Sequence, residues 1–241
     1  APVQNFESIY SDRTTSRFVQ FALVAASEAL EQAKLLDDLK QQQQHRIGVS
    51  IGSGMSSVQE ISNAVRTIDE AGIRKLSPHF VPKVLNNSAA GRVSIEFGLA
   101  GPNFTASSAC AAGSHAIGEA YNCIRNGVAD LMVAGGAEAC IDPLSLAGFC
   151  RLKALSTSFN DDPEGSSRPF DAQRDGFVMG EGACILVLEE LEHAKNRLGD
   201  VNDFVALVGY GASGDAHHIT SPDPHGSGAI RAMEMAMTDA G

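Results

Sequence analysis

Two hydrophobic patterns alternate along the chain. In the first, apolar residues recur every three or four positions, which predicts amphipathic helices. Six stretches follow it: Phe18–Ala33, Val58–Glu70, Ala89–Leu99, Ala111–Arg125, Glu189–Arg197 and Gly228–Ala240. The second pattern, short apolar runs, predicts strands at Arg46–Ile51, Asp130–Ala134, Ala183–Leu188 and Phe204–Tyr210. Strands that alternate with helices favour an α/β fold with a largely parallel sheet.

Turn residues mark several boundaries between these elements. Asn126-Gly127 is a C-terminal cap signal for the helix before it, and Gly135-Gly136 closes the strand before it. The polar tract Gln41–Gln44 is expected to form an exposed loop. Residues 142–182 have no regular periodicity and are rich in Gly, Pro, Ser, Asp and Arg. An irregular stretch of that length inside a compact domain is usually functional.

Composition narrows the class of protein. The 241 residues include 24 glycines, and 44% of the residues are apolar, as in an ordinary globular protein. The net charge of −11 argues against a nucleic-acid binder, which would carry a basic surplus. The apolar run Ala183–Leu188 is far too short to cross a membrane. Residues 1–10 lack the basic start and apolar centre of a signal peptide.

The five cysteines do not indicate a disulfide framework or a zinc site, because their number is odd and no pair has CxxC spacing. They favour free thiols in a reducing compartment. Cys123, Cys140, Cys150 and Cys184 are expected to pack as small apolar side chains. The fifth, Cys110, has different surroundings.

Cys110 stands where an extended run of small residues, Asn103–Ala109, gives way to a helix. At a helix N-terminus, free N–H groups and the positive end of the helix dipole favour the thiolate and stabilise a developing oxyanion. The small side chains around Cys110 leave room for a substrate. This segment alone does not decide between such a nucleophile and a buried cysteine that packs as a small apolar residue.

The segment SSACAAGSHAIGEA around Cys110 resembles the active-site signature of the β-ketoacyl-acyl-carrier-protein synthases, the condensing enzymes of fatty-acid synthesis. The resemblance extends over nearly the whole chain in the family's order. Matching segments include GSGM (52–55), RKLSPHFVP (74–82), DLMVAGGAEA (130–139), PLSLAGF (143–149), RDGFVMGEGA (174–183) and SGDAHHITSPDP (213–224). The most similar subgroup is the synthase II type of bacteria and organelles.

The resemblance implies a thiolase-like α/β fold with layers in the order α-β-α-β-α. Residues 1–200 match most of its N-terminal half, and residues 201–241 match the start of its C-terminal half. The opening strand, expected in the middle of the first sheet, has no counterpart. We therefore expect residues 1–241 to be an excerpt of a longer protein. By itself the excerpt would fold poorly, because central sheet positions would stay unfilled, and would be inactive in condensation.

The implied activity is that of a 3-oxoacyl-[acyl-carrier-protein] synthase. Cys110 would take the acyl group from a thioester, and its backbone N–H would form half of an oxyanion hole. Decarboxylation of malonyl-carrier protein would then give the carbanion that attacks the acyl-cysteine. The implied partners are acyl carrier protein, which brings phosphopantetheine, and a second copy of the chain in a homodimer. We expect no tightly bound cofactor and no metal. The implied location is bacterial cytoplasm or a mitochondrion or plastid-type organelle.

Several apolar side chains match family positions with assigned roles. Met55 matches the residue that limits the acyl pocket, Phe149 a pocket wall, and Phe177 an aromatic near the nucleophile. Phe80 and Val81 match residues near the pocket of the partner subunit. From the residues alone, plain core packing is the stronger interpretation of such side chains.

Three basic residues, Arg74, Lys75 and Lys153, match those that meet the acidic carrier protein. Without the resemblance they indicate only solvated surface charge. The run Asn103–Ala109 matches the strand that pairs across the dimer axis. That pairing would place the two copies of Cys110 on either side of an isologous interface.

The remaining charged residues receive no catalytic role. Arg168, Asp171, Arg174 and Asp175 are expected to hold the irregular loop by structural pairing. None of the seven histidines matches the family's two catalytic ones, and the catalytic lysine also has no counterpart. His115 lies one turn after Cys110 but does not match the family base.

Three alternatives remain open: a ketosynthase domain of a polyketide synthase, a non-catalytic partner subunit similar to a chain-length factor, and a simple cysteine hydrolase.

Overall fold

A four-stranded sheet lies at the centre of the computed structural model, which describes residues 2–36, 39 and 43–241. The strands are β1 (Ile47–Gly52), β2 (Asn103–Phe104), β3 (Leu131–Glu138) and β4 (Gly182–Glu189), in the order β2-β1-β3-β4. β1 runs parallel to β2 and to β3, whereas β4 runs antiparallel to β3. The prediction of a largely parallel sheet is confirmed.

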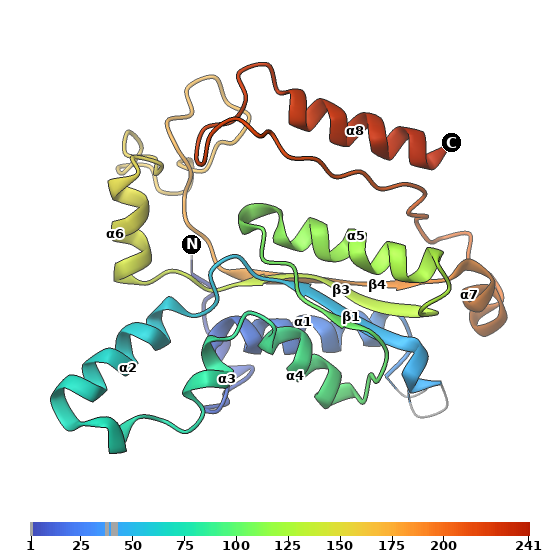
Figure 1. The fold of residues 1–241 in the computed structure, drawn as a ribbon, viewed down its shortest axis with the longest axis horizontal. Helices are drawn as coiled ribbons and strands as arrows, with labels where there is room; N and C mark the ends of the chain where they lie inside the picture. Colours follow the sequence, from blue (N-terminus) through green and yellow to red (C-terminus); the bar gives the residue numbers. More distant parts are fainter. Residues whose placement is uncertain (1, 37–38, 40–42) are drawn as a thin grey trace.

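Helices cover both faces of this sheet (Figure 1). α1 (Arg17–Gln32) and α4 (Ser88–Phe97) pack on one face, and α5 (Ala112–Arg125) packs on the other. The further helices are α2 (Val58–Ala71), α3 (Phe80–Val84), α6 (Pro143–Arg151), α7 (Leu191–Leu198) and α8 (Ser227–Ala240). Short 3-10 turns span Phe6–Ser8, Gln44–Arg46, Ile73–Lys75 and Ala109–Ala111.

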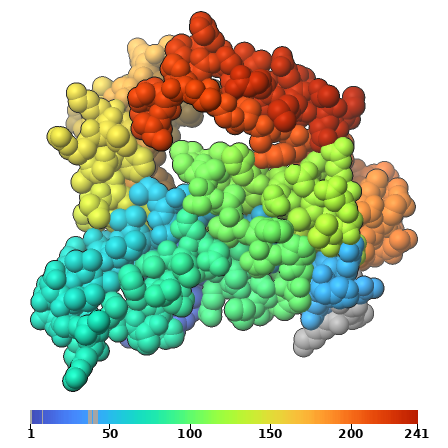
Figure 2. Space-filling view, viewed as in Figure 1, coloured from blue at the N-terminus to red at the C-terminus, as the bar shows by residue number. Residues whose placement is uncertain are grey.

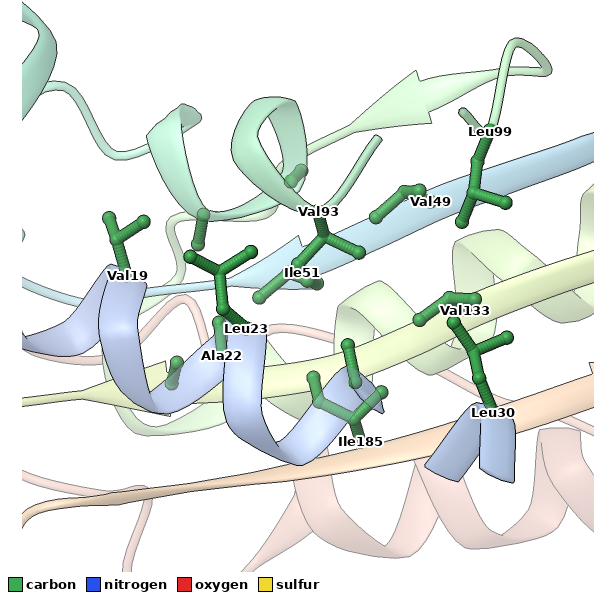
Figure 3. Packing of buried hydrophobic residues seen from close by; sticks show 14 of the residues in the cluster. Val19, Ala22, Leu23, Leu30, Val49, Ile51, Val93, Leu99, Val133 and Ile185 are labelled. Atoms are coloured by element: carbon green, nitrogen blue, oxygen red, sulfur yellow. The ribbon is translucent and has the colours of Figure 1, made fainter. Parts of the chain in front are cut away.

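The main core lies between the sheet and the layer of α1 and α4, as the apolar face of α1 predicts. Figure 3 shows Leu30 of α1, Val93 of α4 and Val133 of β3 within this cluster. Every residue of β1 is buried, because helices cover both faces of the strand. A strand buried on both faces has a continuous apolar run instead of an alternating pattern, which explains why the sequence reveals it.

β3 is longer than the sequence predicts. The strand continues through Gly135 and Gly136 to Glu138, so the prediction that the two glycines close it is wrong. A Cβ on Gly135 would lie 2.0 Å from the carbonyl oxygen of Cys184, and one on Gly136 would lie 3.0 Å from Cα of Gly113. The two glycines therefore allow β4 and α5 to approach the strand closely, and they do not form a turn.

The predicted strand Phe204–Tyr210 is also wrong. Within the described residues, this segment runs between α5 and α8 without a strand partner. A Cβ on Gly118 of α5 would meet the ring of Tyr210, and a Cβ on Gly209 would meet the backbone of Ala236 in α8. Figure 1 shows the order of layers that results: α1 with α4, the sheet, α5, the extended segment and α8. The implied α-β-α-β-α order is present, with its fourth layer reduced to one segment.

The sheet has no gap at the position where the opening strand was expected. β1 and β3 pair directly, from Ile47 opposite Leu131 to Gly52 opposite Gly136. The expectation that central sheet positions stay unfilled is therefore wrong, and poor folding of residues 1–241 no longer follows from it. In the part of the chain that the structure describes, the open edges of the sheet are the outer sides of β2 and β4.

α6 lies in the stretch 142–182, where the sequence pattern predicts no regular element. Two signals mark its start: Asp142 accepts hydrogen bonds from the N–H groups of Leu144 and Ser145, both at 3.0 Å, and Pro143 occupies the first turn. The six predicted helices are confirmed within two residues at each end. In the predicted loop, residues 41 and 42 lie outside the described residues, whereas 43 and 44 are exposed.

Candidate active site

Cys110 is exposed and lies in the 3-10 turn Ala109–Ala111, which leads directly into α5. The expected extended run before it is shorter than predicted, because only Asn103–Phe104 pairs as a strand and Ala109 already belongs to the turn. The prediction that the thiol stands at the start of a helix is confirmed. The alternative of a buried cysteine packed as a small apolar residue is wrong.

The start of α5 rests on the carboxyl ends of two parallel strands. A Cβ on Gly52, the last residue of β1, would lie 2.2 Å from the carbonyl oxygen of Ala112, and Gly113 faces Gly136 of β3. In Figure 2, an opening separates α5 from the C-terminal segment that ends in α8. The N-terminal end of α5, which follows the 3-10 turn with Cys110, lies on the side of this opening (Figure 1). Ligands of open α/β sheets bind at such strand ends.

The backbone before Cys110 adopts a conformation that non-glycine residues rarely take. Ala109 has a φ of 51°, in the left-handed region. Such a conformation persists only where surrounding contacts hold it. The Oγ of Ser108 lies 2.5 Å from Nδ1 of His115, which joins the residue before Ala109 to the first turns of α5. His115, considered above only as a poor candidate for a base, is therefore engaged by Ser108.

Two further hydrogen bonds hold the segment that leads to Ala109. The N–H of Ser53 donates to the carbonyl of Ala106 at 3.2 Å. The side-chain amide of Asn86 donates to Oγ of Ser107 at 2.6 Å. Asn86 is not predicted from the sequence, and no spacing rule would have found it, because its partner lies 21 residues further along the chain.

Two of the predicted pocket residues come together. The rings of Phe149, on α6, and Phe177 meet edge to face, with centroids 5.2 Å apart and planes at 81°. Phe177 also lines a hollow of about 220 Å³ together with Leu155, Phe159 and Met179. Met55 lies on the turn after β1 and is 38% exposed, so its side chain is not core packing.

The other predicted pocket residues lie on a separate element. Phe80 is half-buried and Val81 is 58% exposed, both at the start of α3, which packs against α2 and α4. The interpretation as plain core packing is wrong for Val81. An exposed apolar side chain here is compatible with the predicted place beside the pocket of a partner subunit.

The three predicted carrier-binding residues are exposed but lie at two places. Arg74 and Lys75 occupy the 3-10 turn beyond the C-terminal end of α2, and Lys153 follows the C-terminal end of α6. These two helix ends point away from each other in Figure 1. Any carrier protein that meets all three must therefore bridge both places.

Asp175 holds the irregular loop, but its partners are uncharged donors and not the charged side chains that the predicted structural pairing implies. Its carboxylate accepts hydrogen bonds from Oγ of Ser156 at 2.5 Å and from the N–H groups of Thr157 and Ser158 at 2.9 and 2.8 Å. These donors stabilise the charged form and hold the pKa of Asp175 far below its ordinary value of 3.8. A carboxyl group of this kind stays ionised and is not an acid–base catalyst at neutral pH.

The other cysteines follow the prediction only in part. Cys123 and Cys140 are buried, and burial raises the pKa of both thiols. Cys150 and Cys184 are exposed, so the expectation that they pack as apolar side chains is wrong. Cys184 lies on β4 next to the buried Ile185, and neighbouring strand residues point to opposite faces. α1 covers the face of Ile185, whereas the other face of β4 is less covered.

The described residues provide neither a metal-binding cluster nor a membrane-spanning helix. No group of three or more His, Cys, Asp or Glu side chains is arranged to hold a metal ion in residues 2–36, 39 and 43–241. None of the described helices combines the length and the apolar character that crossing a membrane requires.

Comparison with known proteins decides the family. The family model for the N-terminal domain of beta-ketoacyl synthases matches residues 4–194. The chain belongs to the beta-ketoacyl synthase family. Its thiolase-like fold agrees with the crystal structure of a beta-ketoacyl synthase from Burkholderia phymatum STM815. That structure matches with a TM-score of 0.87 at 38% identity, over 100% of this chain and 58% of the other.

Relatives with names support the synthase II subgroup. A protein of Arabidopsis thaliana, named 3-oxoacyl-[acyl-carrier-protein] synthase, mitochondrial, is 49% identical over 96% of this chain and 50% of its own length. A protein of Rhizobium meliloti, named 3-oxoacyl-[acyl-carrier-protein] synthase 2, is 50% identical over 95% of this chain and 54% of its own length. The chain thus spans about half the length of the curated relatives it matches.

Proposed function

We propose that the full-length protein is a 3-oxoacyl-[acyl-carrier-protein] synthase that lengthens fatty acids, with Cys110 as its nucleophile. The observation that carries the proposal is the position of Cys110. Its thiol is exposed on the 3-10 turn just before α5. The start of α5 rests on the ends of β1 and β3, and an opening separates α5 from the C-terminal segment. The names of the two relatives support the reaction class.

In the first half-reaction, the sulfur of Cys110 attacks the carbonyl carbon of an acyl thioester. The carbon–sulfur bond to the carrier breaks, and the carrier leaves as a thiolate that takes up the proton lost by the Cys110 thiol. The N–H of Ala111 donates to the carbonyl of Ser108 at 3.1 Å, and that of Ala112 donates to the carbonyl of Ala109. The donor proposed for the oxyanion of the tetrahedral intermediate is therefore the N–H of Cys110 itself. The acyl group then remains on Cys110 as a new thioester.

In the second half-reaction, malonyl-carrier protein loses CO2 and gives a carbanion at its α-carbon. The carbanion attacks the carbonyl carbon of the acyl-cysteine, and the Cys110 sulfur leaves as a thiolate. The product is a 3-oxoacyl chain two carbons longer on the carrier. Splitting one difficult carbon–carbon bond formation into two steps is the gain from covalent catalysis.

The pocket residues have matching positions in this proposal. Phe149 and Phe177 form an apolar wall, supported by their edge-to-face contact, and Met55 limits the acyl chain from the turn after β1. Phe80 and Val81 border the pocket of a partner subunit, which the exposure of Val81 supports. The roles of these side chains are proposed from the family positions that they match. Of these roles, the structure supports most directly the apolar wall of Phe149 and Phe177, because the two rings are in contact.

The proposed partners are an acyl carrier protein and a second copy of the chain. The carrier brings phosphopantetheine with the acyl or malonyl group and docks on Arg74, Lys75 and Lys153, and the enzyme itself has no tightly bound cofactor. For the homodimer, β2 is an edge strand with Phe104 41% exposed, so its outer backbone is accessible to another strand in the described chain. The proposed location is a mitochondrion, a plastid-type organelle or the bacterial cytoplasm.

The test is an elongation assay of the full-length protein. Acyl-carrier protein and malonyl-carrier protein are supplied, and the 3-oxoacyl product is identified by mass spectrometry. The wild type should form the product that is two carbons longer, and Cys110→Ala should form none. Cys184→Ala, which removes another exposed cysteine, should retain the wild-type rate. Elongation by Cys110→Ala would contradict the proposal.

The same assay separates the alternatives. Thioester hydrolysis without elongation would indicate a cysteine hydrolase, which needs a base near the thiol. An inert wild type would indicate a non-catalytic partner subunit, and elongation that continues through several uncorrected 3-oxo units would indicate a polyketide ketosynthase.

A further inference from the structure

Glu138, the last residue of β3, holds the turn that follows β1. Its Oε2 accepts a hydrogen bond from the N–H of Gly54 at 2.7 Å and another from the N–H of Met55 at 3.2 Å. The two strands pair in register up to Gly52 and Gly136, so Glu138 reaches past the end of this ladder to the turn. Hydrogen bonds from backbone N–H groups to a carboxylate are stronger than neutral ones.

The second oxygen of the same carboxylate is also engaged. Sγ of Cys140 donates to Oε1 of Glu138 at 3.2 Å. Burial and the nearby charge of Glu138 raise the pKa of Cys140, so its sulfur keeps the proton that it donates. Glu138 is half-buried and is therefore fixed from both sides. Its carboxylate has one well-defined position from which to hold the turn.

The turn held by Glu138 contacts the residue before the nucleophile. A Cβ on Gly54 would lie 3.0 Å from Oε2 of Glu138 and 3.4 Å from both Cα and the carbonyl oxygen of Ala109. The backbone of Gly54 thus fills the space between the carboxylate and Ala109. Because Ala109 has the strained φ of 51°, it depends on such neighbours to keep its conformation.

We propose that Glu138 is a positioning residue: through Gly54 and Ala109 it fixes the orientation of the Cys110 thiol for acyl transfer. The proposal rests on the function proposed above for Cys110. Glu138 does not touch the reacting atoms, and its effect passes through the turn. Without the carboxylate, two N–H groups lose their acceptor, the turn relaxes, and Ala109 can leave the left-handed region. The thiol would then spend less time aimed at the thioester carbonyl.

The experiment measures acyl transfer from acyl-carrier protein to Cys110 in single turnovers of the full-length protein. Glu138→Ala should lower the rate constant at saturating substrate about tenfold or more, because two hydrogen bonds to a charged group are lost, with KM nearly unchanged. Glu138→Gln keeps an acceptor oxygen and should recover most of the rate. As a matched control, Glu190→Ala removes another carboxylate that accepts a backbone N–H, that of His193 at 2.7 Å, and should leave the rate unchanged.

A double-mutant cycle distinguishes positioning from a general loss of stability. Ala109→Gly removes the strain that the turn restrains, so Glu138→Ala should add little to the loss that Ala109→Gly causes. If the two losses multiply in full, Glu138 does not act through Ala109 and the proposal is wrong. A wild-type rate for Glu138→Ala would overturn it as well. If Glu138→Ala does not fold, Gly54→Ala replaces it, since its added Cβ displaces the same turn.

A second readout keeps this inference separate from the proposed function. Alkylation of Cys110 by iodoacetamide needs no carrier protein and no condensation. If the wild type takes up no acyl group, the proposed function fails, whereas the alkylation rates still test Glu138. Glu138→Ala should change the alkylation rate of Cys110 and leave that of the exposed Cys150 as it is. Equal changes at both cysteines would contradict the positioning role.

Discussion

The hydroxyl of Ser108 and Nδ1 of His115 lie 2.5 Å apart, so the two residues that flank Cys110 are joined across the start of α5. This hydrogen bond connects the strained backbone before Cys110 to the helix after it. It also engages the histidine that lies nearest to Cys110 along the chain. We infer that His115 braces the turn.

Removing either partner of this bond should have the same effect. Ser108→Ala and His115→Ala should each cost about 1 kcal/mol of stability and slow acyl transfer to Cys110 by about tenfold or less. The double variant should be little worse than either single one, because both remove the same contact. A general base would behave differently: His115→Ala would lose about 10²–10⁴ in rate, while Ser108→Ala would stay close to the wild type. Single-turnover acylation kinetics and denaturant unfolding distinguish these outcomes.

Gly52 should be intolerant of any side chain, because α5 begins directly on it. The added Cβ of Gly52→Ala would lie 2.2 Å from the carbonyl oxygen of Ala112. We expect the free energy of unfolding to fall by about 1–3 kcal/mol or more. Gly91 of α4 is the matched control, since a Cβ there meets nothing within 4 Å. Gly91→Ala should stabilise the protein by about 0.5–1 kcal/mol. Equal unfolding curves for the two variants would contradict the described packing of α5.

Asp175 should stay ionised well into the acid range. Its pKa in the folded protein lies below the ordinary value of 3.8 because Ser156, Thr157 and Ser158 donate to the carboxylate. A depressed pKa means that the contribution of Asp175 to stability is present above pH 3.8 and is lost only as the pH falls through the folded-state value.

Carbon-13 NMR of the side-chain carboxyl checks this sign. We expect no titration of Asp175 between pH 7 and its ordinary pKa, and Asp175→Asn should speed amide exchange at Thr157 and Ser158. The exposed Asp161, a neighbour on the same loop, provides the control variant Asp161→Asn. A titration midpoint at or above 3.8 would contradict the loop geometry.

If Arg74 and Lys75 bind the carrier protein, their replacement should raise KM only for substrates that are attached to the carrier protein. Arg74→Glu with Lys75→Glu should raise KM for acyl-carrier protein about tenfold or more, since long-range attraction to an acidic partner turns into repulsion. The same variant should use acyl-pantetheine, which lacks the protein, as the wild type does. Arg66→Glu changes an exposed basic residue on α2 and should have a smaller effect. Similar losses with both substrates would place Arg74 and Lys75 outside the carrier surface.

Helices and buried strands could be predicted from the sequence because each leaves a local pattern. The apolar face of α1 and the continuous apolar run of β1 follow from burial on one side and on both sides. Gly135 and Gly136 were misinterpreted because the sequence does not distinguish a glycine needed for close packing from a glycine needed for a turn. Phe204–Tyr210 has the composition of a strand, but a strand also requires a neighbour, which composition does not contain.

The candidate site could be predicted only where its residues are neighbours in the sequence. Cys110 was found because an extended segment and a helix meet at that residue. Glu138 and Asn86 were missed, because their partners Gly54, Met55 and Ser107 are brought to them by the pairing of β1 and β3 and by packing. Contacts between segments that are distant in the sequence leave no characteristic spacing of residues by which they could be predicted. The same limit explains why exposed Cys150 and Cys184 were predicted to be buried.

The most direct test of the account is to locate the acyl group after one half-reaction. The full-length protein is mixed with acyl-carrier protein in the absence of malonyl-carrier protein, digested, and examined by mass spectrometry. We expect the acyl mass on the peptide that contains Cys110, and on no other cysteine peptide. An acyl group on Cys150 or Cys184, or an unmodified Cys110 in a protein that still elongates chains, would contradict the central claim.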